Sequence, residues 1–232
     1  MSAVSASSSS SAPASALAPV DASAASASSC AELASVHSAS PTLSPAAPDA
    51  PWLLLIDMQE AFASGSSPWG LHCFRDAMPA VLALIESHAP RVVATRFVPP
   101  AGEAPGAWAA YYVRNRFAIA PEAAPLWELV PEVADALRRL VPGGAQILSA
   151  HTFGKWNAEM DAAIGGARSV VIAGVSTDCC VLNTALAAAD AGCYVRVAAD
   201  ACAATTPLAH NRALDVLEEF TPLISVTGRT NK

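Results

Sequence analysis

The stretch from Ser169 to Val181, SVVIAGVSTDCCV, constrains the fold of this chain more than any other. It opens with β-branched and small apolar residues (170–173), which are typical of a strand buried on both faces of a parallel sheet. We expect Gly174 to end this strand, and the Ser, Thr and Asp that follow favour a helix start. The alanine-rich segment 181–191 then predicts a helix that Gly192 closes.

Cys179 and Cys180 are therefore expected where a helix begins, at the carboxyl end of a central strand. Unpaired N–H groups and the positive end of the helix dipole lower the pKa of a thiol at such a place, and they can also hold an oxyanion. The sequence thus predicts a cysteine nucleophile. Two inert buried thiols are the simpler alternative, because that is the most common state of a free cysteine.

The composition predicts one well-buried α/β domain, with 53% hydrophobic and 14% charged residues in a chain of 232. A net charge of −7 without any basic run argues against a nucleic-acid partner. No apolar run approaches the ~20 residues that a membrane span needs, so no membrane partner is expected. The six cysteines form no C-x-x-C pair and no group with histidine, which favours reduced thiols in a cytoplasmic protein over a zinc site or a disulfide framework.

Residues 1–50 consist almost entirely of Ala, Ser, Pro and Val. Such a segment lacks the large apolar side chains that offset the entropy cost of ordering, so we predict a disordered tail. No basic residue precedes an apolar core, as a signal peptide would require, and a transit peptide would normally carry arginines. The globular domain is expected to span residues 51–232.

Segments typical of strands and of helices alternate along this domain. Strands are predicted at 52–56, 91–97, 145–148, 170–173, 194–198 and 223–226, and helices at 76–87, 107–117, 126–140, 157–164, 181–191 and 207–220. This alternation predicts an α/β fold with a parallel sheet and helices on both faces.

Three polar side chains follow predicted strands, where the carboxyl ends of parallel strands meet: Asp57, Lys155 and Cys180. A thiolate can attack a carbonyl carbon, a carboxylate can move a proton onto the departing amine, and an ammonium stabilises both charges. Lys232 is the only other lysine and ends the chain, so a site that uses a lysine is expected to use Lys155. A helix cap for Asp57 and a solvated surface position for Lys155 are the ordinary structural alternatives.

The chain resembles the isochorismatase-like cysteine hydrolases, which include nicotinamidases and several carbamoyl-amide hydrolases. The resemblance covers about 52–226, and three motifs carry it: LLLIDMQ (53–59), AGVSTDCCVLNTALAAADAG (173–192) and YVRVAADACAA (194–204). It implies a six-stranded parallel sheet flanked by helices, which is a Rossmann-like three-layer fold. It also implies a small-molecule substrate and a homo-oligomer.

By this resemblance, Asp57 matches the family's catalytic aspartate and Cys180 matches its nucleophile, while Cys179 occupies a variable position. The family has a cis peptide bond at the place of Val175–Ser176. The resemblance therefore assigns Val175, Ser176 and Cys180 to the oxyanion site, with the main-chain N–H groups of Ser176 and Cys180 as donors.

The chain departs from the family pattern in two places. The family lysine usually ends the third strand, where this chain has Ala150, so either Lys155 reaches in from the loop or the catalytic triad is incomplete. We favour the first alternative. Nicotinamidases carry an Asp-x-His metal cluster after the second strand, but residues 95–99 read TRFVP here. We therefore expect no metal and no other cofactor.

The sequence thus predicts an amidohydrolase that cleaves an amide or carbamoyl C–N bond through a thioester. A vinyl-ether hydrolase of the isochorismatase type, a catalytically weak binding protein and a redox-active Cys179–Cys180 pair are the alternatives. The segment 107–117 is either a lid over the site or an amphipathic helix packed on the sheet. The predicted substrate-binding residues are Trp69, Arg96, Trp108, Tyr112 and Arg114, whose arginines favour a substrate with a carboxylate.

Overall fold

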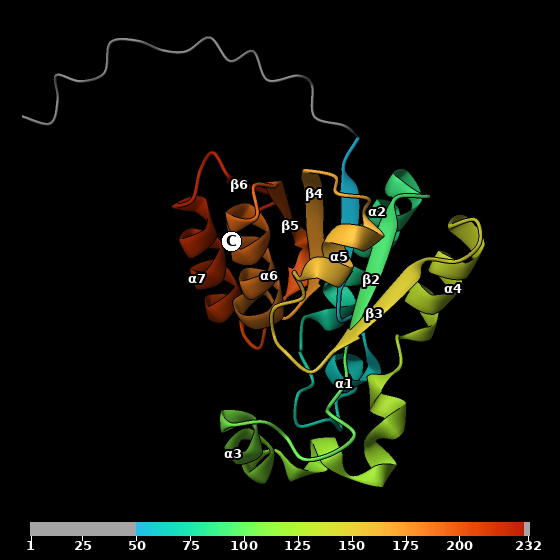
Figure 1. Ribbon diagram of the computed structural model, residues 1–232, viewed down its shortest axis with the longest axis vertical. Coiled ribbons are helices and arrows are strands. Elements are labelled where there is room, and N and C mark those ends of the chain that lie inside the picture. Colours follow the sequence, from blue (N-terminus) through green and yellow to red (C-terminus); the bar gives the residue numbers. More distant parts are fainter. Residues whose placement is uncertain (1–49, 230–232) are drawn as a thin grey trace, which may run out of the picture. The chain divides into compact units, whose positions relative to one another are not determined.

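The computed structural model describes residues 50–229, which form one parallel β-sheet with helices on both faces (Figure 1). The sheet has six strands in the order β3-β2-β1-β4-β5-β6, and every neighbouring pair is parallel. The strands are β1 (Trp52–Ile56), β2 (Val92–Phe97), β3 (Gln146–Ala150), β4 (Ser169–Val175), β5 (Tyr194–Ala203) and β6 (Ile224–Thr227). The predicted fold class, including the number of strands, is confirmed.

The helical segments fall into two groups. The α-helices are α1 (Glu60–Ala63), α2 (Phe74–His88), α3 (Ala107–Arg114), α4 (Pro131–Leu140), α5 (Ala158–Ala163), α6 (Leu182–Asp190) and α7 (Pro207–Glu218). The others are the 3₁₀ helices η2 (Arg116–Ile119) and η3 (Pro121–Trp127) and the short π-helix η4 (Thr177–Val181).

Alternate residues of β1 explain why both faces of the sheet are covered. Leu53 and Leu55 belong to the core beneath α2 and α4, whereas Leu54 and Ile56 belong to the core beneath α5, α6 and α7. Successive side chains of a strand point to opposite faces, so a run of four buried aliphatic residues requires a layer of helices on each side. Figure 1 shows these two layers.

Gly174 does not end β4 as expected, because the strand continues through Val175. Its φ angle is +116°, and a Cβ atom added there would lie 2.1 Å from the carbonyl oxygen of Ile56. The backbones of β1 and β4 therefore approach each other at a point where only glycine fits. This close approach brings the carboxyl ends of the two central strands together.

The helix predicted at 126–140 begins later than expected. Residues 121–127 form η3, and α4 starts only at Pro131, which occupies its first position. Proline has no N–H to donate to a preceding turn, so it starts helices more readily than it continues them. β5 is longer than predicted and reaches Ala203, because its pairing with β4 continues past an irregularity between Ile172 and Gly174.

The segments α1, α3, η2 and η3 gather beyond the carboxyl end of the sheet (Figure 1). Two of them reach the candidate site described below: α1 through Phe62 and α3 through Tyr111. The five cysteines within 50–229 are free thiols, whereas Cys30 and the predicted tail (residues 1–49) lie outside the described residues. Within 50–229, no helix has both the length and the apolar character that crossing a bilayer requires.

Candidate functional site

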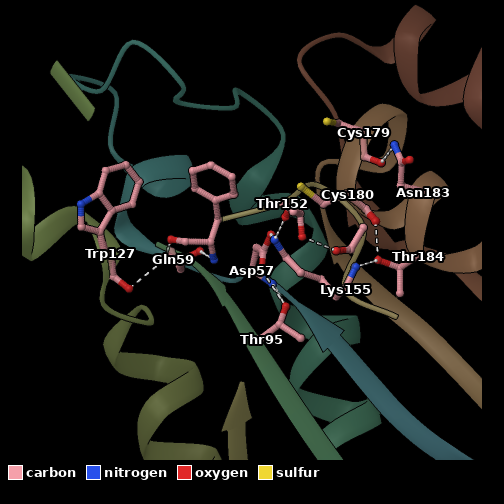
Figure 2. Close-up of polar contacts among 12 residues, drawn as sticks. Asp57, Gln59, Thr95, Trp127, Thr152, Lys155, Cys179, Cys180, Asn183 and Thr184 are labelled. Carbon is pink, nitrogen blue, oxygen red and sulfur yellow. Dashed lines mark hydrogen bonds and ion pairs between the residues drawn. The ribbon is translucent and has the colours of Figure 1, made fainter. Parts of the chain in front are cut away.

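Asp57, Lys155 and Cys180 point toward one another at the carboxyl end of the sheet (Figure 2). Asp57 directly follows β1, Lys155 lies in the loop between β3 and α5, and Cys180 lies in η4 after β4. Their exposed fractions are 0%, 2% and 4%, so the three side chains meet in a site that is almost closed to solvent. The structure thus brings together the three residues that the sequence singled out.

Asp57 has an unusual backbone conformation, and its side chain interacts with Thr95 and Lys155. Its φ angle is +50°, in the left-handed region that side chains other than Asn and Asp rarely adopt. Thr95 Oγ1 accepts a hydrogen bond from the Asp57 N–H at 3.2 Å and donates one to Oδ1 at 2.6 Å. Oδ2 lies 3.1 Å from Lys155 Nζ, in an ion pair that lacks hydrogen-bond geometry. Oδ2 is therefore the carboxylate oxygen that is free to exchange a proton.

The pKa of Asp57 is raised above its ordinary value. Burial is the largest cause, because it penalises the charged form of the carboxyl group. The Lys155 ammonium and the Thr95 hydroxyl oppose the shift, and the neighbouring Cys180 thiol does so to a lesser extent. A carboxyl group with a raised pKa is a better general acid, and hence better suited to return a proton to a leaving group.

Lys155 reaches the site from the loop and not from the end of the strand. Its Nζ donates a hydrogen bond to the Thr152 carbonyl at 2.5 Å and lies 5.0 Å from the centre of the Phe97 ring. Ala150, where the resemblance places the family lysine, ends β3 five positions earlier in the chain. The ion pair with Asp57 shows that this loop brings an ammonium group into the site.

Thr184 on α6 connects the lysine loop to the cysteine turn. Its Oγ1 accepts a hydrogen bond from the Lys155 N–H at 3.0 Å and donates one to the Cys180 carbonyl at 2.6 Å. Thr184 is completely buried, so no water competes for either bond. A single hydroxyl group therefore sets the position of the loop relative to the turn (Figure 2).

The Cys180 thiol differs from expectation in its acidity. Its pKa is raised well above the ordinary value by its interaction with the Cys179 thiol, by burial and by the Asp57 carboxylate, while Lys155 opposes the shift. The lowered pKa that is expected at a helix start is wrong for this cysteine. The Cys180 side chain interacts with the Cys179 thiol, is only 4% exposed and faces an anion, and each of these disfavours the thiolate more than the helix dipole favours it. Cys180 therefore holds its proton until a base removes it.

Cys179 is the more acidic of the two thiols. Its interaction with Cys180 lowers its pKa, while burial and the charge of Asp178 oppose this shift. The side chain is half-buried and lines the same cavity as Cys180. The two neighbours thus differ in exposure and in acidity.

The turn that carries Cys180 offers backbone N–H groups to the site. The Val175–Ser176 peptide bond is cis, as the resemblance implied. The Ser176 N–H finds no hydrogen-bond acceptor within residues 50–229, whereas the N–H groups of Cys179 and Val181 donate to the Ser176 carbonyl. The Ser176 side chain donates to Asp178 instead of capping the helix, which corrects the expected capping role.

A cavity of about 260 Å³ opens beside Cys180, and we call it the aromatic cavity. Its lining residues are Phe62, Pro68, Trp69, Gly70, Leu71, Phe97, Tyr111, Phe153, Ser176, Asp178, Cys179, Cys180 and Thr205. Aromatic rings thus make up much of its wall. Tyr111 belongs to α3, so this helix does cover the site, as the lid interpretation predicted.

Of the five predicted substrate-binding residues, only Trp69 lines the aromatic cavity. Arg96 pairs with Glu128 at 3.0 Å outside the cavity, and Arg114 is exposed at the end of α3. Trp108 packs behind Phe153, with ring centres 4.9 Å apart, and Tyr112 is buried on another side of α3. The structure thus places these four residues outside the lining of the aromatic cavity, and their role in substrate binding stays a prediction.

Several further residues belong to the site, and the sequence holds a signal for some of them. Arg96 lies between Thr95 and Phe97 on β2, and adjacent residues of a strand point to opposite faces of the sheet. If Arg96 points away from the site, the alternation of side chains therefore places Thr95 and Phe97 on the other face. Thr184 stands four positions after Cys180, which is one helical turn and hence within reach of its carbonyl. Tyr111 had no such signal, because its place depends on the path of the preceding loop.

The carboxyl end of β2 does not fit the metal cluster of the nicotinamidases. The Thr95 hydroxyl is hydrogen-bonded to Asp57, Arg96 is a cation, and the Phe97 ring stacks on Phe153. None of these side chains therefore offers a metal ligand. Among residues 50–229, no three His, Cys, Asp or Glu side chains gather as metal ligands do.

Comparisons with known proteins agree with this geometry. Residues 51–228 match the family described as Isochorismatase domain. The comparison with curated proteins gave no match. Solved structures with the same fold include a cysteine hydrolase from Pseudomonas syringae pv. phaseolicola 1448A, with 16% identity, a TM-score of 0.64, and coverage of 77% of this chain and 89% of that one.

Two further solved structures are similar over almost their whole length. Nicotinamidase PncA from Bacillus subtilis is 17% identical, with a TM-score of 0.63 and coverage of 76% of this chain and 98% of that one. Pyrazinamidase of Pyrococcus horikoshii, in complex with zinc, is 22% identical, with a TM-score of 0.59 and coverage of 78% and 99%. The family match covers most of the chain, and these structures share its fold. The chain therefore belongs to the isochorismatase family of hydrolases.

Proposed function

We propose that this protein hydrolyses a small-molecule amide or carbamoyl C–N bond through a thioester on Cys180. The observation that carries the proposal is the placement of Asp57. Its Oδ2 faces an ammonium group at 3.1 Å, and the carboxyl group neighbours the thiol of Cys180, which lines the aromatic cavity. The names of the nicotinamidase and pyrazinamidase that share the fold point to the same class of bond.

In the first half of the reaction, Cys180 Sγ attacks the carbonyl carbon while Asp57 accepts the thiol proton. Lys155 stabilises the resulting charge on Asp57. The carbonyl oxygen becomes an oxyanion, and the N–H groups of Ser176 and Cys180 are its proposed donors. Asp57 then gives the proton to the departing nitrogen, the C–N bond breaks, and a thioester remains.

In the second half, water attacks the thioester carbonyl while Asp57 accepts one of its protons. The C–S bond breaks, the proton returns to Cys180, and the carboxylic acid leaves. Lys155 stays paired with Asp57 throughout, since its side chain is almost completely buried and Asp57 is its only ion-pair partner within residues 50–229. The raised pKa values of Cys180 and Asp57 suit a proton that shuttles between them.

The amide reaction is favoured over vinyl-ether hydrolysis because family members that cleave vinyl ethers need no nucleophilic cysteine. Here a buried thiol lies beside the carboxylate, which gives it a chemical role. The ion pair between Lys155 and Asp57 also weakens the binding-protein alternative, because that alternative rested on the missing lysine at position 150.

The test is ammonia release from a panel of small amides and carbamoyl compounds by the protein and its Cys180→Ala variant. We expect turnover by the native chain, none by the variant, and unchanged circular dichroism and melting temperature. Cys193→Ala is the matched control, because Cys193 is also buried but lies directly before β5 and does not line the aromatic cavity. Full activity in Cys180→Ala would exclude Cys180 as the nucleophile, and turnover of vinyl ethers alone would favour the other reaction.

A further inference from the structure

The aromatic cavity is lined by one charged side chain, which is negative. Asp178 is the only carboxylate among the residues that line it, and no Lys, Arg or His side chain of the described residues does so. Lys155 lies behind Cys180 and is neutralised by Asp57. A substrate carboxylate would therefore meet no cation in this cavity, contrary to what the predicted arginines implied.

Asp178 has hydrogen-bonding capacity left for a ligand. It is half-buried in η4, where Oδ1 accepts a hydrogen bond from the Ser176 hydroxyl. Oδ2 is 3.5 Å from the Thr205 hydroxyl, which is the long limit of a hydrogen bond. A carboxylate can accept about four hydrogen bonds, so Asp178 can still attract a cation or a donor in the cavity.

Several other lining residues present aromatic rings. Trp69 packs against Phe97 and Tyr111, with ring centres 5.7 Å and 6.1 Å away, and all three line the cavity. The faces of aromatic rings carry partial negative charge, and they attract ammonium groups most strongly where water is excluded. An aromatic wall together with one carboxylate is the combination that recognises an organic cation.

We propose that the substrate is an amide whose acyl part carries a quaternary or protonated amine, and that Asp178 and the rings of Trp69 and Tyr111 bind this cation. The inference rests on the proposed amide hydrolysis and names its substrate class. Cys180 and Asp178 line the same cavity within one turn of chain, so a small amide can place its carbonyl at the thiol and its cation at the carboxylate. Anionic amides are excluded by repulsion from Asp178.

Three amides of similar size test this proposal: trimethylammonioacetamide, its neutral isostere 3,3-dimethylbutanamide, and the anion malonamate. Their kcat/KM values are each divided by the rate of alkaline hydrolysis, which removes the effect of the substituent on the reactivity of the amide. Dissociation constants are measured in parallel with the Cys180→Ala variant, which cannot turn the amides over. We expect the cation to exceed its neutral isostere by roughly tenfold in both measurements, and the anion to be the poorest.

Asp178→Asn keeps the shape of the side chain and its acceptor for Ser176 but removes the charge. We expect the ratio of cation to neutral isostere to fall about tenfold in this variant. Asp190→Asn, which removes an exposed carboxylate from α6, is the control and should keep the native ratio.

The two proposals fail in different ways. If the amides are hydrolysed but the cation has no advantage, or its advantage survives Asp178→Asn, the substrate class is wrong and amide hydrolysis stands. If none is hydrolysed but the cation still binds best to Cys180→Ala, the cation site stands and the proposed reaction is wrong for this class. Failure of the cation to bind at all overturns the inference.

Discussion

At the scale of single residues, burial decides the chemistry of the site more than the helix dipole does. Asp57 and Cys180 both have raised pKa values, and each has burial among its main causes. Burial disfavours the charged form of each group, so the nucleophile forms only as the thiol proton moves to a base. Lys155 opposes the raised pKa of both groups, whereas Asp178 acts on the neighbouring Cys179, whose pKa its charge raises.

Alkylation distinguishes the two adjacent thiols. We expect iodoacetamide at neutral pH to modify Cys179 before Cys180, because Cys179 is more exposed and its pKa is lowered while that of Cys180 is raised. Peptide mass spectrometry over a time course between about pH 5 and 9 measures both rates. Cys73, a half-buried cysteine outside the aromatic cavity, gives the reference rate. Faster labelling of Cys180 would mean that its thiolate is already formed in the free protein.

Removal of the ammonium group changes both the pH profile and the stability. Lys155 lowers the pKa of Asp57, so Lys155→Met should raise that pKa further and move the acid limb of kcat/KM to higher pH. A carboxyl group whose pKa is higher in the folded chain binds protons on folding, so stability falls as pH rises from the unfolded pKa through the folded one. We therefore expect a loss of about 3–5 kcal/mol at neutral pH that is partly recovered in acid.

Denaturant titrations across pH and the pH dependence of kcat/KM check both effects of Lys155→Met. Arg168→Met is the matched control, since it removes a cation from an exposed ion pair with Asp161. That control should leave the acid limb in place. An unmoved acid limb in Lys155→Met would show that Asp57 does not titrate beside this lysine.

At the scale of elements, the site depends on contacts between segments that are distant in sequence. Thr184 on α6 holds both the Lys155 loop and the turn of Cys180. Thr184→Val keeps the shape but leaves the buried Lys155 N–H without its acceptor, which costs about 1–3 kcal/mol. We expect a lower melting temperature, a lower kcat and a shifted acid limb as Lys155 moves from Asp57. Thr184→Ser should restore all three; a variant that loses stability but keeps the native pH profile would limit Thr184 to a structural role.

The elements that could be predicted are those that a short run of neighbouring residues determines. The apolar run 52–56 predicted β1 correctly, and the positions of Asp57 and Cys180 followed because each stands directly after a central strand. The start of α4 and the π-helical turn η4 were missed, because proline placement and the packing of a loop decide them. The contact of Lys155 with Asp57 joins two loops about a hundred residues apart. The sequence could therefore offer Lys155 as a candidate, but it could not show that its ammonium group reaches Asp57.

At the scale of the whole molecule, the family match begins at residue 51 and the structure describes residues from 50. We expect a chain of residues 51–232 to melt at the same temperature as the full chain and to hydrolyse amides with the same kcat/KM. Both are measured side by side on purified proteins. A lower melting temperature or loss of activity in the shorter chain would show that residues 1–50 take part in the domain. The homo-oligomer stays a prediction, which light scattering on both chains addresses.

The loop that carries Lys155 has a consequence for how relatives of this protein are compared. Position 150 holds an alanine where the resemblance places a lysine, yet the ammonium group of Lys155, five positions later, pairs with Asp57. The charge beside Asp57 thus depends on where the loop carries the side chain and not on one fixed position in the chain. Relatives with an alanine at the end of the third strand deserve a search of the following loop before they are counted as pseudoenzymes.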